Sequence, residues 1–421
     1  MNHIRLISPV DGSLYAERPL IGSHQLEQVL HQAQEAQRAW RQLTLEQRAG
    51  YCLKAVDAML AMKDEIVPEL AWQMGRPVRF GAGELRGFEE RARYMIGIAA
   101  SALADVVPEP KEGFRRFIRR EPLGTVLVVA PWNYPYLTAV NAIIPALMAG
   151  NAVLLKHASQ ALLVGERFAQ AFAHAGLPDG LFHNLVLDHG QTGALIASGQ
   201  VQQVNFTGSV EGGRMMESAA AGHFIGVGLE LGGKDPAYVR ADADLAHAVE
   251  NLVDGSFFNS GQSCCGIERI YVDQKLYPAF VEGFVELTRQ YVLGNPLDQA
   301  TTLGPLVRAQ AAEFVRGQIA QATSRGAKAL IDASSFAADA PGTPYLAPQV
   351  LVQVDHEMAV MREESFGPVV GIMPVASDAE PTRPLCCGRT YLSQGLVDEA
   401  KVEAQRVMAA LAPALAENSP G

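Results

Sequence analysis

Cysteine is scarce in this chain, and its arrangement excludes two common structural roles. The 421 residues contain five cysteines, four of them in adjacent pairs: Cys52, Cys264, Cys265, Cys386 and Cys387. An odd number of thiols, mostly beside poor partners, does not make a disulfide framework. No C-x-x-C or H-E-x-x-H spacing occurs, so we expect no metal site. The composition fits a reducing compartment, and we expect a cytoplasmic protein.

Basic charge and long apolar runs are also in short supply. The chain has 34 Lys and Arg against 45 Asp and Glu, for a net charge of −11, and its one dense basic cluster lies between Arg115 and Arg120. This balance argues against a nucleic-acid surface. No apolar run approaches the roughly 18 residues of a membrane span, and the first ten residues lack the apolar centre of a secretory signal. We therefore expect neither nucleic acid nor membrane among the partners.

What the chain does contain is enough apolar sequence for more than one core. At 421 residues and 48% apolar composition, at least two domains are expected. Residues 23–103 have a helical pattern, with Thr44 to Gln47 as a candidate capping box. Residues 106–122 place apolar side chains among arginines around a glycine. We predict a β-hairpin there that projects and contacts another subunit of a homodimer or homotetramer.

After Gly124 short β-rich segments alternate with helical segments. The predicted strands cover residues 125–130, 151–156, 181–187, 200–206 and 224–230. Strict alternation of this kind predicts an α/β fold with a doubly wound, Rossmann-like parallel sheet. In such sheets ligands bind beyond the carboxyl ends of the strands.

Polar side chains mark several of those strand ends. Asn133 follows the first strand, Lys156 ends the second, Ser209 follows the fourth and Glu230 ends the fifth. Each residue alone is also typical of a turn. Together, on one edge of one sheet, they predict a binding site.

Glycine-rich segments offer three candidate phosphate loops. Residues 228–234 read GLELGGK, but Asp235 stands where a phosphate loop needs Ser or Thr. Residues 81–87 read GAGELRG without a preceding strand, and we predict a junction between helices. Residues 206–213 read FTGSVEGG between a strand and a helix, where the helix N-terminus can attract a pyrophosphate. The third segment alone has the right context.

Six motifs occur in the order and approximate spacing of one known family. They are PWNYP (131–135), KHAS (156–159), FTGSVEGG (206–213), LELGGKDP (229–236), FFNSGQSCCG (257–266) and EESFGPV (363–369). From about residue 8 to residue 380 the chain resembles the aldehyde dehydrogenase superfamily. Cys264 follows Glu230 by 34 residues, as the family pattern requires. The resemblance implies NAD(P)-dependent oxidation of an aldehyde to a carboxylic acid.

The family's architecture implies a division of the chain into domains. The cofactor domain would comprise residues 1–105 and 123–233. The oligomerisation hairpin would comprise residues 106–122. An incomplete catalytic domain would cover 234–380, followed by an atypical tail over 381–421.

The resemblance also assigns catalytic roles. Cys264, two places after the Gln of G-Q-x-C, would be the nucleophile, and Cys265 either a small buried neighbour or a redox guard. Asn133 and the backbone N–H of Cys264 would stabilise the oxyanion. Glu230 would be the general base for the deacylating water.

A second set of residues would hold NAD or NADP. By resemblance Lys156 meets the adenosine ribose, Gly208 and Ser209 the pyrophosphate, and Glu364 the nicotinamide ribose. The full set is Trp132, Lys156, Ser159, Gly208, Ser209, Gly213, Leu231, Glu364 and Phe366. NAD-preferring relatives commonly carry an acid at the position of Ser159. A neutral hydroxyl there does not repel a 2′-phosphate, so we expect NADP to be accepted, with NAD as an alternative.

The chain departs from the family motifs after about Glu380. A shifted reading frame or alternative end would explain the departure and would remove one wall of the aldehyde tunnel. The alternative function is therefore a weak or inactive relative that acts only through cofactor or subunit binding. An acyl-thioester or acyl-phosphate reductase is disfavoured, because Glu230 would be unnecessary where hydrolysis must be avoided.

Overall fold

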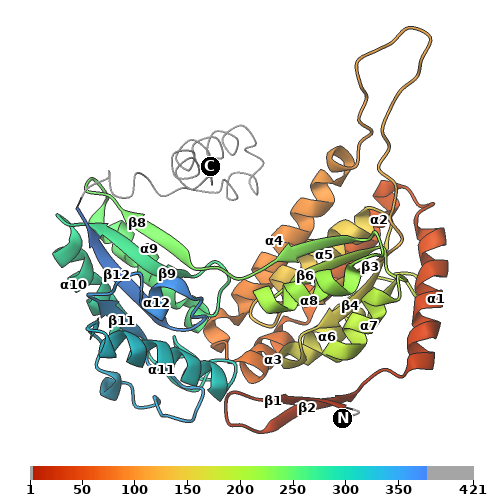
Figure 1. The fold of residues 1–421 in the computed structure, drawn as a ribbon. Helices are drawn as coiled ribbons and strands as arrows, with labels where there is room; N and C mark the ends of the chain where they lie inside the picture. Colours follow the sequence, from red (N-terminus) through yellow and green to blue (C-terminus); the bar gives the residue numbers. More distant parts are fainter. Residues whose placement is uncertain (1–2, 377–421) are drawn as a thin grey trace.

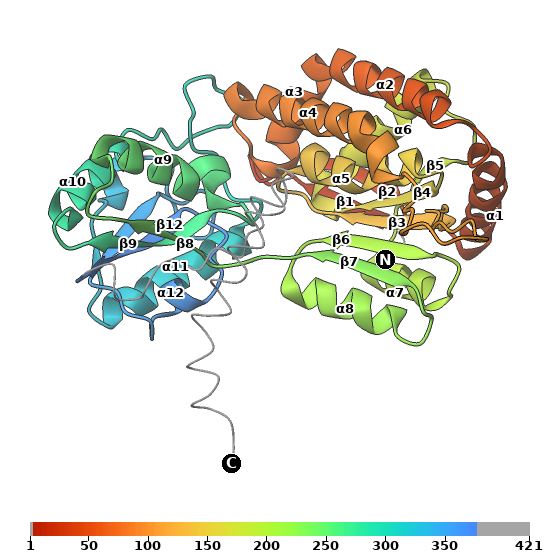
Figure 2. The same ribbon diagram turned by 90° about the horizontal axis from the view of Figure 1, so that it is seen from above.

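The computed structural model describes residues 3–376, which form two lobes side by side, each built on a five-stranded sheet (Figure 1, Figure 2). The strands of the first sheet are β3 (Thr125–Ala130), β4 (Ala152–His157), β5 (Phe182–Asn184), β6 (Gln203–Thr207) and β7 (Gly226–Glu230). Their order is β5-β4-β3-β6-β7, and all neighbours are parallel. The predicted doubly wound α/β sheet is confirmed, with the five predicted strands in place.

The centre of this sheet is where the chain reverses its direction of winding. β3 and β4 are buried along their whole length, and the apolar runs of residues 126–130 and 152–155 explain most of this burial, whereas Lys156 and His157 at the end of β4 are buried polar side chains. From β3 the chain first builds outward through β4 and β5, then returns to place β6 on the other side of β3. The carboxyl ends of β3 and β6 therefore flank the topological switch point, where ligands bind in such sheets.

Helices cover both faces of the first sheet (Figure 2). Their bounds are α1 (Ser23–Trp40), α2 (Leu45–Ala61), α3 (Lys63–Met74), α4 (Val78–Ala102), α5 (Pro135–Met148), α6 (Leu162–His174), α7 (His189–Ala197) and α8 (Val210–Ala220). The predicted capping box at the start of α2 is confirmed, since the side chains and backbone N–H groups of Thr44 and Gln47 bond reciprocally. An antiparallel ribbon of β1 (His3–Ile7) and β2 (Leu14–Pro19) lies beneath this lobe in Figure 1.

The second lobe has its own sheet, in the order β10-β11-β12-β9-β8. Its strands are β8 (Asp235–Val239), β9 (Ile267–Asp273), β10 (Lys328–Ala329), β11 (Gln349–Val352) and β12 (Val369–Val375). Its helices are α9 (Leu245–Phe257), α10 (Tyr277–Thr288), α11 (Ala309–Ser324) and the short α12 (Ala359–Arg362). Residues 231–234 join the last strand of the first sheet to the first strand of the second. The predicted tail over 381–421 lies outside the described residues.

The glycine-rich segment 81–87 is not a junction between helices. It lies inside α4, which is continuous over 25 residues. A Cβ on Gly81 would stand 2.7 Å from a methyl of Val67, and one on Gly87 would stand 3.0 Å from Leu137. These glycines let α4 pack closely against α3 and α5, so tertiary packing outweighs their low helix propensity.

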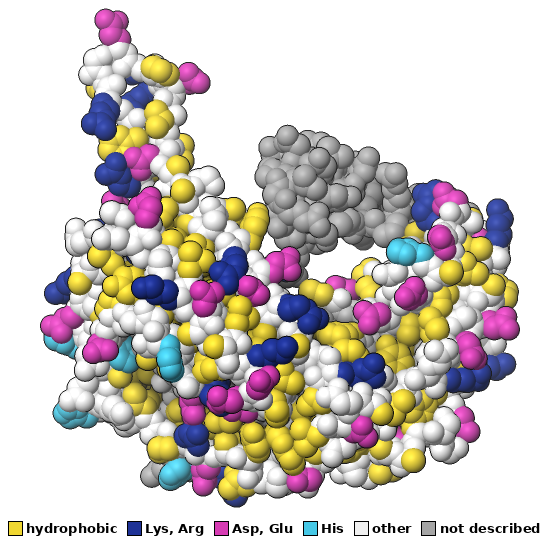
Figure 3. Space-filling view, turned by 180° about the vertical axis from the view of Figure 1, so that it is seen from behind, with side chains coloured by type: hydrophobic (Ala, Val, Ile, Leu, Met, Phe, Trp, Pro, Cys, Tyr) yellow, Lys and Arg dark blue, Asp and Glu magenta, His cyan; other side chains and the backbone are white. Residues whose placement is uncertain are grey.

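The segment predicted as a hairpin does project from the first lobe (Figure 1, Figure 3). Its two arms meet in isolated antiparallel bridges, Val106 with Ile118 and Lys111 with Phe114, and the chain reverses near Gly113 at a φ of 77°. No continuous ladder forms between residues 106 and 120, so the reversal is confirmed but a regular β-hairpin is not. Elsewhere in the described chain, no helix is both long and apolar enough to cross a membrane.

Candidate active site

A cavity of about 440 Å³ lies at the carboxyl ends of the first sheet's strands. All of the predicted site residues except Gly213 line it: Trp132, Asn133, Lys156, Ser159, Gly208, Ser209, Glu230, Leu231, Cys264, Glu364 and Phe366. The four polar strand ends thus meet at one edge, as the sheet topology requires. Gly213 does not line the cavity, and a Cβ on it would stand 2.7 Å from the Leu231 side chain. Its role is to let Leu231 pack against α8.

Cys264 follows a tightly wound segment of backbone. Asn259, Ser260 and Gly261 have φ values of 55°, 57° and 70°, three consecutive residues in the left-handed region. A serine there is strained, and such strain persists only where the surroundings hold it. A Cβ on Gly261 would collide with the carbonyl oxygen of Gly367, so only glycine fits.

Gln262 anchors this loop from within. It is 1% exposed, its Oε1 accepts from the N–H of Val307 at 2.8 Å, and its Nε2 donates to the carbonyl of Asn259 at 3.2 Å. Cys264 is half-buried, and its sulfur lies 3.7 Å from that of Cys265. Cys265 is exposed, so the expectation of a buried neighbour is wrong. The backbone that precedes the Cys264 thiol is therefore held in place by the hydrogen bonds of Gln262.

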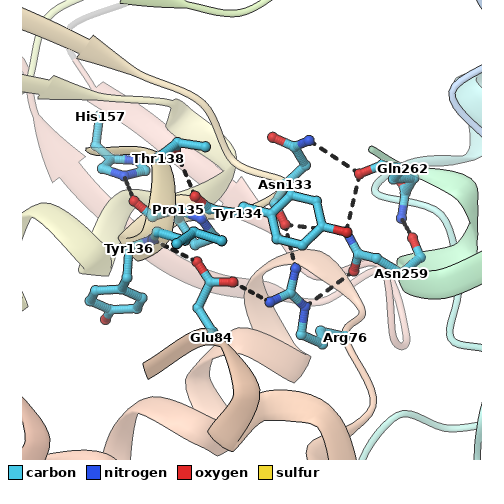
Figure 4. A network of polar contacts seen from close by, with 11 residues as sticks. Arg76, Glu84, Asn133, Tyr134, Pro135, Tyr136, Thr138, His157, Asn259 and Gln262 are labelled. Atoms are coloured by element: carbon cyan, nitrogen blue, oxygen red, sulfur yellow. Dashed lines mark hydrogen bonds and ion pairs between the residues drawn. The ribbon is translucent and has the colours of Figure 1, made fainter. Parts of the chain in front are cut away.

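Asn133 is tied to the same loop through a buried network (Figure 4). Its Nδ2 donates to the carbonyl of Gln262 at 3.1 Å. Its own carbonyl accepts from Arg76 Nη2 at 2.6 Å and from Asn259 Nδ2 at 3.2 Å. The guanidinium of Arg76 also pairs with the carboxylate of Glu84 and lies 4.7 Å from the centre of the Tyr134 ring. Asn133 is 5% exposed, and two segments set its position: the loop between α3 and α4, and residues 259–262.

Sequence reasoning missed Arg76 and Glu84. Glu84 Oε1 accepts from the N–H groups of Tyr136 and Leu137 at 2.9 and 3.0 Å, so it binds the free donors at the start of α5. The one signal in the sequence is spacing, since Glu84 shares the core-facing side of α4 with Phe88. Arg76 and Glu84 are 2% exposed each, which identifies a buried ion pair.

The N-terminus of α8 opens onto the cavity beside Gly208. Ser209 is the N-cap, and its Oγ accepts from the N–H of Gly212 at 3.1 Å. A Cβ on Gly208 would stand 2.6 Å from the Phe206 ring. Bare backbone at a helix N-terminus is a cradle for a phosphate group. Gly208, Ser209 and the N-terminus of α8 therefore fit the pyrophosphate of a dinucleotide.

Lys156 and Ser159 stand at another wall of the cavity. Lys156 is 8% exposed, and burial lowers the pKa of its ammonium, against a smaller opposing effect of Asp188. Ser159 is exposed and begins a short 3₁₀ turn after β4. A cation and a neutral hydroxyl therefore face the same space.

Glu364 and Phe366 enter the cavity on a loop that a second buried ion pair holds. Glu268 accepts from the N–H groups of Ser365 and Phe366 at 2.8 and 2.9 Å and pairs with Lys234 Nζ at 2.6 Å. Burial raises the pKa of Glu364, whose Oε1 accepts from Gly233 N–H at 3.2 Å. The motif residue Lys234 had no predicted role, and Glu268 had no distinguishing signal in the sequence.

A second cavity, of about 890 Å³, reaches the same thiol from the other side. It lies among α4, α5 and the strands β3, β6 and β7. Six residues line both spaces: Val129, Ala130, Phe206, Thr207, Glu230 and Cys264. Glu230, the exposed last residue of β7, and Cys264 therefore stand where the two cavities meet. A ligand in each could reach one sulfur.

Comparisons with known proteins give one consistent result. The family model described as "Aldehyde dehydrogenase family" matches residues 1–408, past the end of the motif comparison near residue 380. The chain is 32% identical over 380 residues to the succinate semialdehyde dehydrogenase [NAD(P)+] Sad of Escherichia coli K12, covering 90% of this chain and 81% of the relative. It is 31% identical over 385 residues to the glutarate-semialdehyde dehydrogenase of Pseudomonas aeruginosa, covering 90% of this chain and 78% of the relative. The solved succinic semialdehyde dehydrogenase of Streptococcus pyogenes, in complex with NADP+, is similar at 27% identity and a TM-score of 0.84, covering 90% and 82%.

Proposed function

The chain belongs to the aldehyde dehydrogenase family, and from that premise we propose that it oxidises an aldehyde to a carboxylic acid at Cys264, with NAD or NADP as acceptor. One observation carries the proposal: Cys264 and Glu230 stand at the junction of two cavities. The smaller cavity fits a dinucleotide, and the larger offers an aldehyde its own route to the thiol.

The first step forms a bond between sulfur and carbon. The thiolate of Cys264 adds to the carbonyl carbon, and the carbonyl oxygen becomes an oxyanion in a thiohemiacetal. The Asn133 amide has a second N–H beyond the one given to Gln262, and the backbone N–H of Cys264 is the other proposed donor. When bound, the oxidised nicotinamide supplies the acceptor for the hydride that leaves this carbon.

The second step frees the enzyme. The remaining thioester must be hydrolysed, and the Glu230 carboxylate takes a proton from the attacking water. The carbon–sulfur bond then breaks, the carboxylic acid departs and the thiolate is restored. Glu230 suits this role because its side chain is exposed and lines both cavities, so water has access to it.

Cofactor choice follows from the cavity wall at Lys156 and Ser159. We propose that the cation and the neutral hydroxyl accept the 2′-phosphate of NADP as well as the free hydroxyl of NAD. Glu364 would hold the nicotinamide ribose, with Trp132 and Phe366 beside it, their ring centres 5.7 Å apart. Cys52, Cys264 and Cys265 stand as thiols, which fits action in a reducing compartment such as the cytoplasm.

Self-association is proposed through the projecting segment 106–120. Val107, Phe114 and Ile118 are 73%, 65% and 63% exposed there. Exposed apolar side chains gathered on one projection favour a contact with a second copy. We propose a homodimer or homotetramer on this basis.

The test is steady-state turnover, followed as absorbance of the reduced nicotinamide with each cofactor. The substrates are simple aliphatic aldehydes and semialdehydes, the class in the names of the curated relatives. Cys264→Ala should abolish turnover, while the matched Cys265→Ala should retain it. Glu230→Gln should keep a single rapid release of reduced cofactor and lose about 10²- to 10⁴-fold in steady-state rate.

Two results would contradict the proposal. Turnover that survives in Cys264→Ala would show that Cys264 is not the nucleophile. If the unmodified protein shows no turnover with any aldehyde and either cofactor, the alternative is favoured, namely an inactive relative that acts only through cofactor or subunit binding.

A further inference from the structure

The larger cavity contains charged side chains at two places. Among the described residues that line it, Arg91 is the cation and Glu230 the anion. Glu230 and Cys264 stand where the two cavities meet, whereas Arg91 lies on α4 and lines the larger cavity only. The cavity is thus negative at the reacting end and positive farther out.

The packing of α4 on α5 sets the position of Arg91. Glu84 binds the N–H groups at the start of α5, and Gly87, one turn later, packs on Leu137. Arg91, a further turn along α4, and Asn141 on α5 both line the cavity. The two helices begin at the active-site end, and helical side chains lean toward the N-terminus. Arg91 and the thiol of Cys264 therefore line one and the same cavity.

Arg91 is unpaired, in contrast to its neighbour. Arg93 binds both Asp57 and Glu89, at 2.6 and 2.9 Å. Arg91 forms no ion pair with any residue in the described part of the chain. Its five N–H donors are available to a ligand, and a guanidinium suits a carboxylate because the two groups can pair through two parallel bonds.

The separation suits a short carbon chain. Asn141 lies six residues after the first residue of α5, an axial distance of about 9 Å. The long Arg91 side chain and a short aldehyde together have a comparable length, so a short semialdehyde is the ligand that this part of the cavity suits. Glu230 at the near end repels a second negative charge, so an anionic group is directed outward.

We propose that Arg91, assisted by Asn141 and Thr138, binds a carboxylate at the far end of the aldehyde and so makes a semialdehyde the preferred substrate class. The inference rests on the proposed function, because it concerns the same reaction at Cys264. It adds the residue that selects the substrate.

The experiment compares succinic semialdehyde with butanal, which has the same carbon chain without the carboxylate. Arg91→Ala should lower kcat/KM for the semialdehyde about 10- to 100-fold, mainly through KM, and leave butanal unchanged. Arg91→Lys should recover part of the loss, because it keeps the charge but not the paired geometry. Arg86→Ala is the matched control, since Arg86 is an exposed arginine on α4 that does not line the cavity.

A second measurement does not depend on turnover. Succinate should slow the labelling of Cys264 by iodoacetamide in the unmodified protein and in Arg86→Ala, but not in Arg91→Ala. Equal losses for both substrates in Arg91→Ala, or an unchanged ratio, would overturn the inference while butanal turnover still supports the proposed function. Absence of turnover with either substrate would overturn the proposed function, and the inference with it.

Discussion

His157 shows how a single buried ring supports the active-site loop. Its Nδ1 accepts from the N–H of Ala158 at 3.0 Å, so the ring proton resides on Nε2, 3.2 Å from the carbonyl of Pro135 (Figure 4). Burial lowers the pKa of His157 to about 4, and the Pro135 carbonyl opposes this only in part. The neutral ring therefore belongs to the folded state, and protonation would disturb the segment that carries Asn133.

The unfolding free energy should consequently fall in mild acid. The pKa of His157 is about 4 when folded and 6.5 when exposed, so between these values the unfolded chain binds more protons. As pH falls from 6.5 to 4, the stabilisation from this residue should be lost, up to about 3 kcal/mol. Urea unfolding at a series of pH values measures it.

His157→Asn should flatten that pH dependence. His174→Asn, which changes an exposed histidine at the end of α6, should leave it as in the unmodified protein. A pH profile that is identical in His157→Asn and the unmodified protein would refute the assignment.

Residues at strand ends could be predicted, because the rule that places them is local. Asn133, Lys156 and Glu230 each follow a recognisable strand, and parallel strands bring their ends together. Arg76 could not be predicted, since its partner Asn259 is 183 residues away and only tertiary packing joins them.

At the scale of elements, the start of α5 depends on a side chain from α4. Glu84 takes the place of a local cap, since Tyr134 at the N-cap makes no side-chain hydrogen bond there. Arg76 neutralises the charge that this arrangement buries. Two helices and the Asn133 loop therefore share one carboxylate.

Glu84→Gln should lower the unfolding free energy by about 3 to 5 kcal/mol, because it leaves Arg76 charged and buried without its counter-ion. Denaturant unfolding followed by circular dichroism measures the change. Glu90→Gln, at an exposed position of the same helix, should change stability by less than about 0.5 kcal/mol. A loss in Glu84→Gln no larger than in the Glu90 variant would show that the pair contributes little.

Strands and helices were predicted correctly where a single sequence signal is strong. Residues 126–130 are uninterrupted apolar sequence and, with Thr125, form β3 with the predicted bounds. Residues 81–87 were misjudged, because glycines that signal a break in isolation are required here for close helix packing.

At the scale of the whole molecule, the projecting segment 106–120 carries apolar side chains that a single chain leaves exposed. Three apolar side chains stand on it at more than 60% exposure, beside several arginines (Figure 3). We predict that Phe114→Ser with Ile118→Ser weakens self-association by about 10-fold or more. Sedimentation equilibrium measures the constant.

The control for this change is Phe314→Ser, which removes an exposed phenylalanine on α11 and should leave the association constant unaltered. A mass that is the same in the double variant and the unmodified protein would place the contact elsewhere. The sequence suggested such a contact through composition alone, whereas the division into domains near residue 233 relied on resemblance and stays a prediction.

The groups that we propose to react come from different lobes. Asn133 and Glu230 belong to the first sheet, and Cys264 belongs to the loop that precedes β9 in the second. If these groups act together as proposed, neither lobe expressed by itself should carry out the reaction, because the proposed centre exists only along their shared boundary. A substitution that loosens this boundary could silence the protein while every reacting group remains intact.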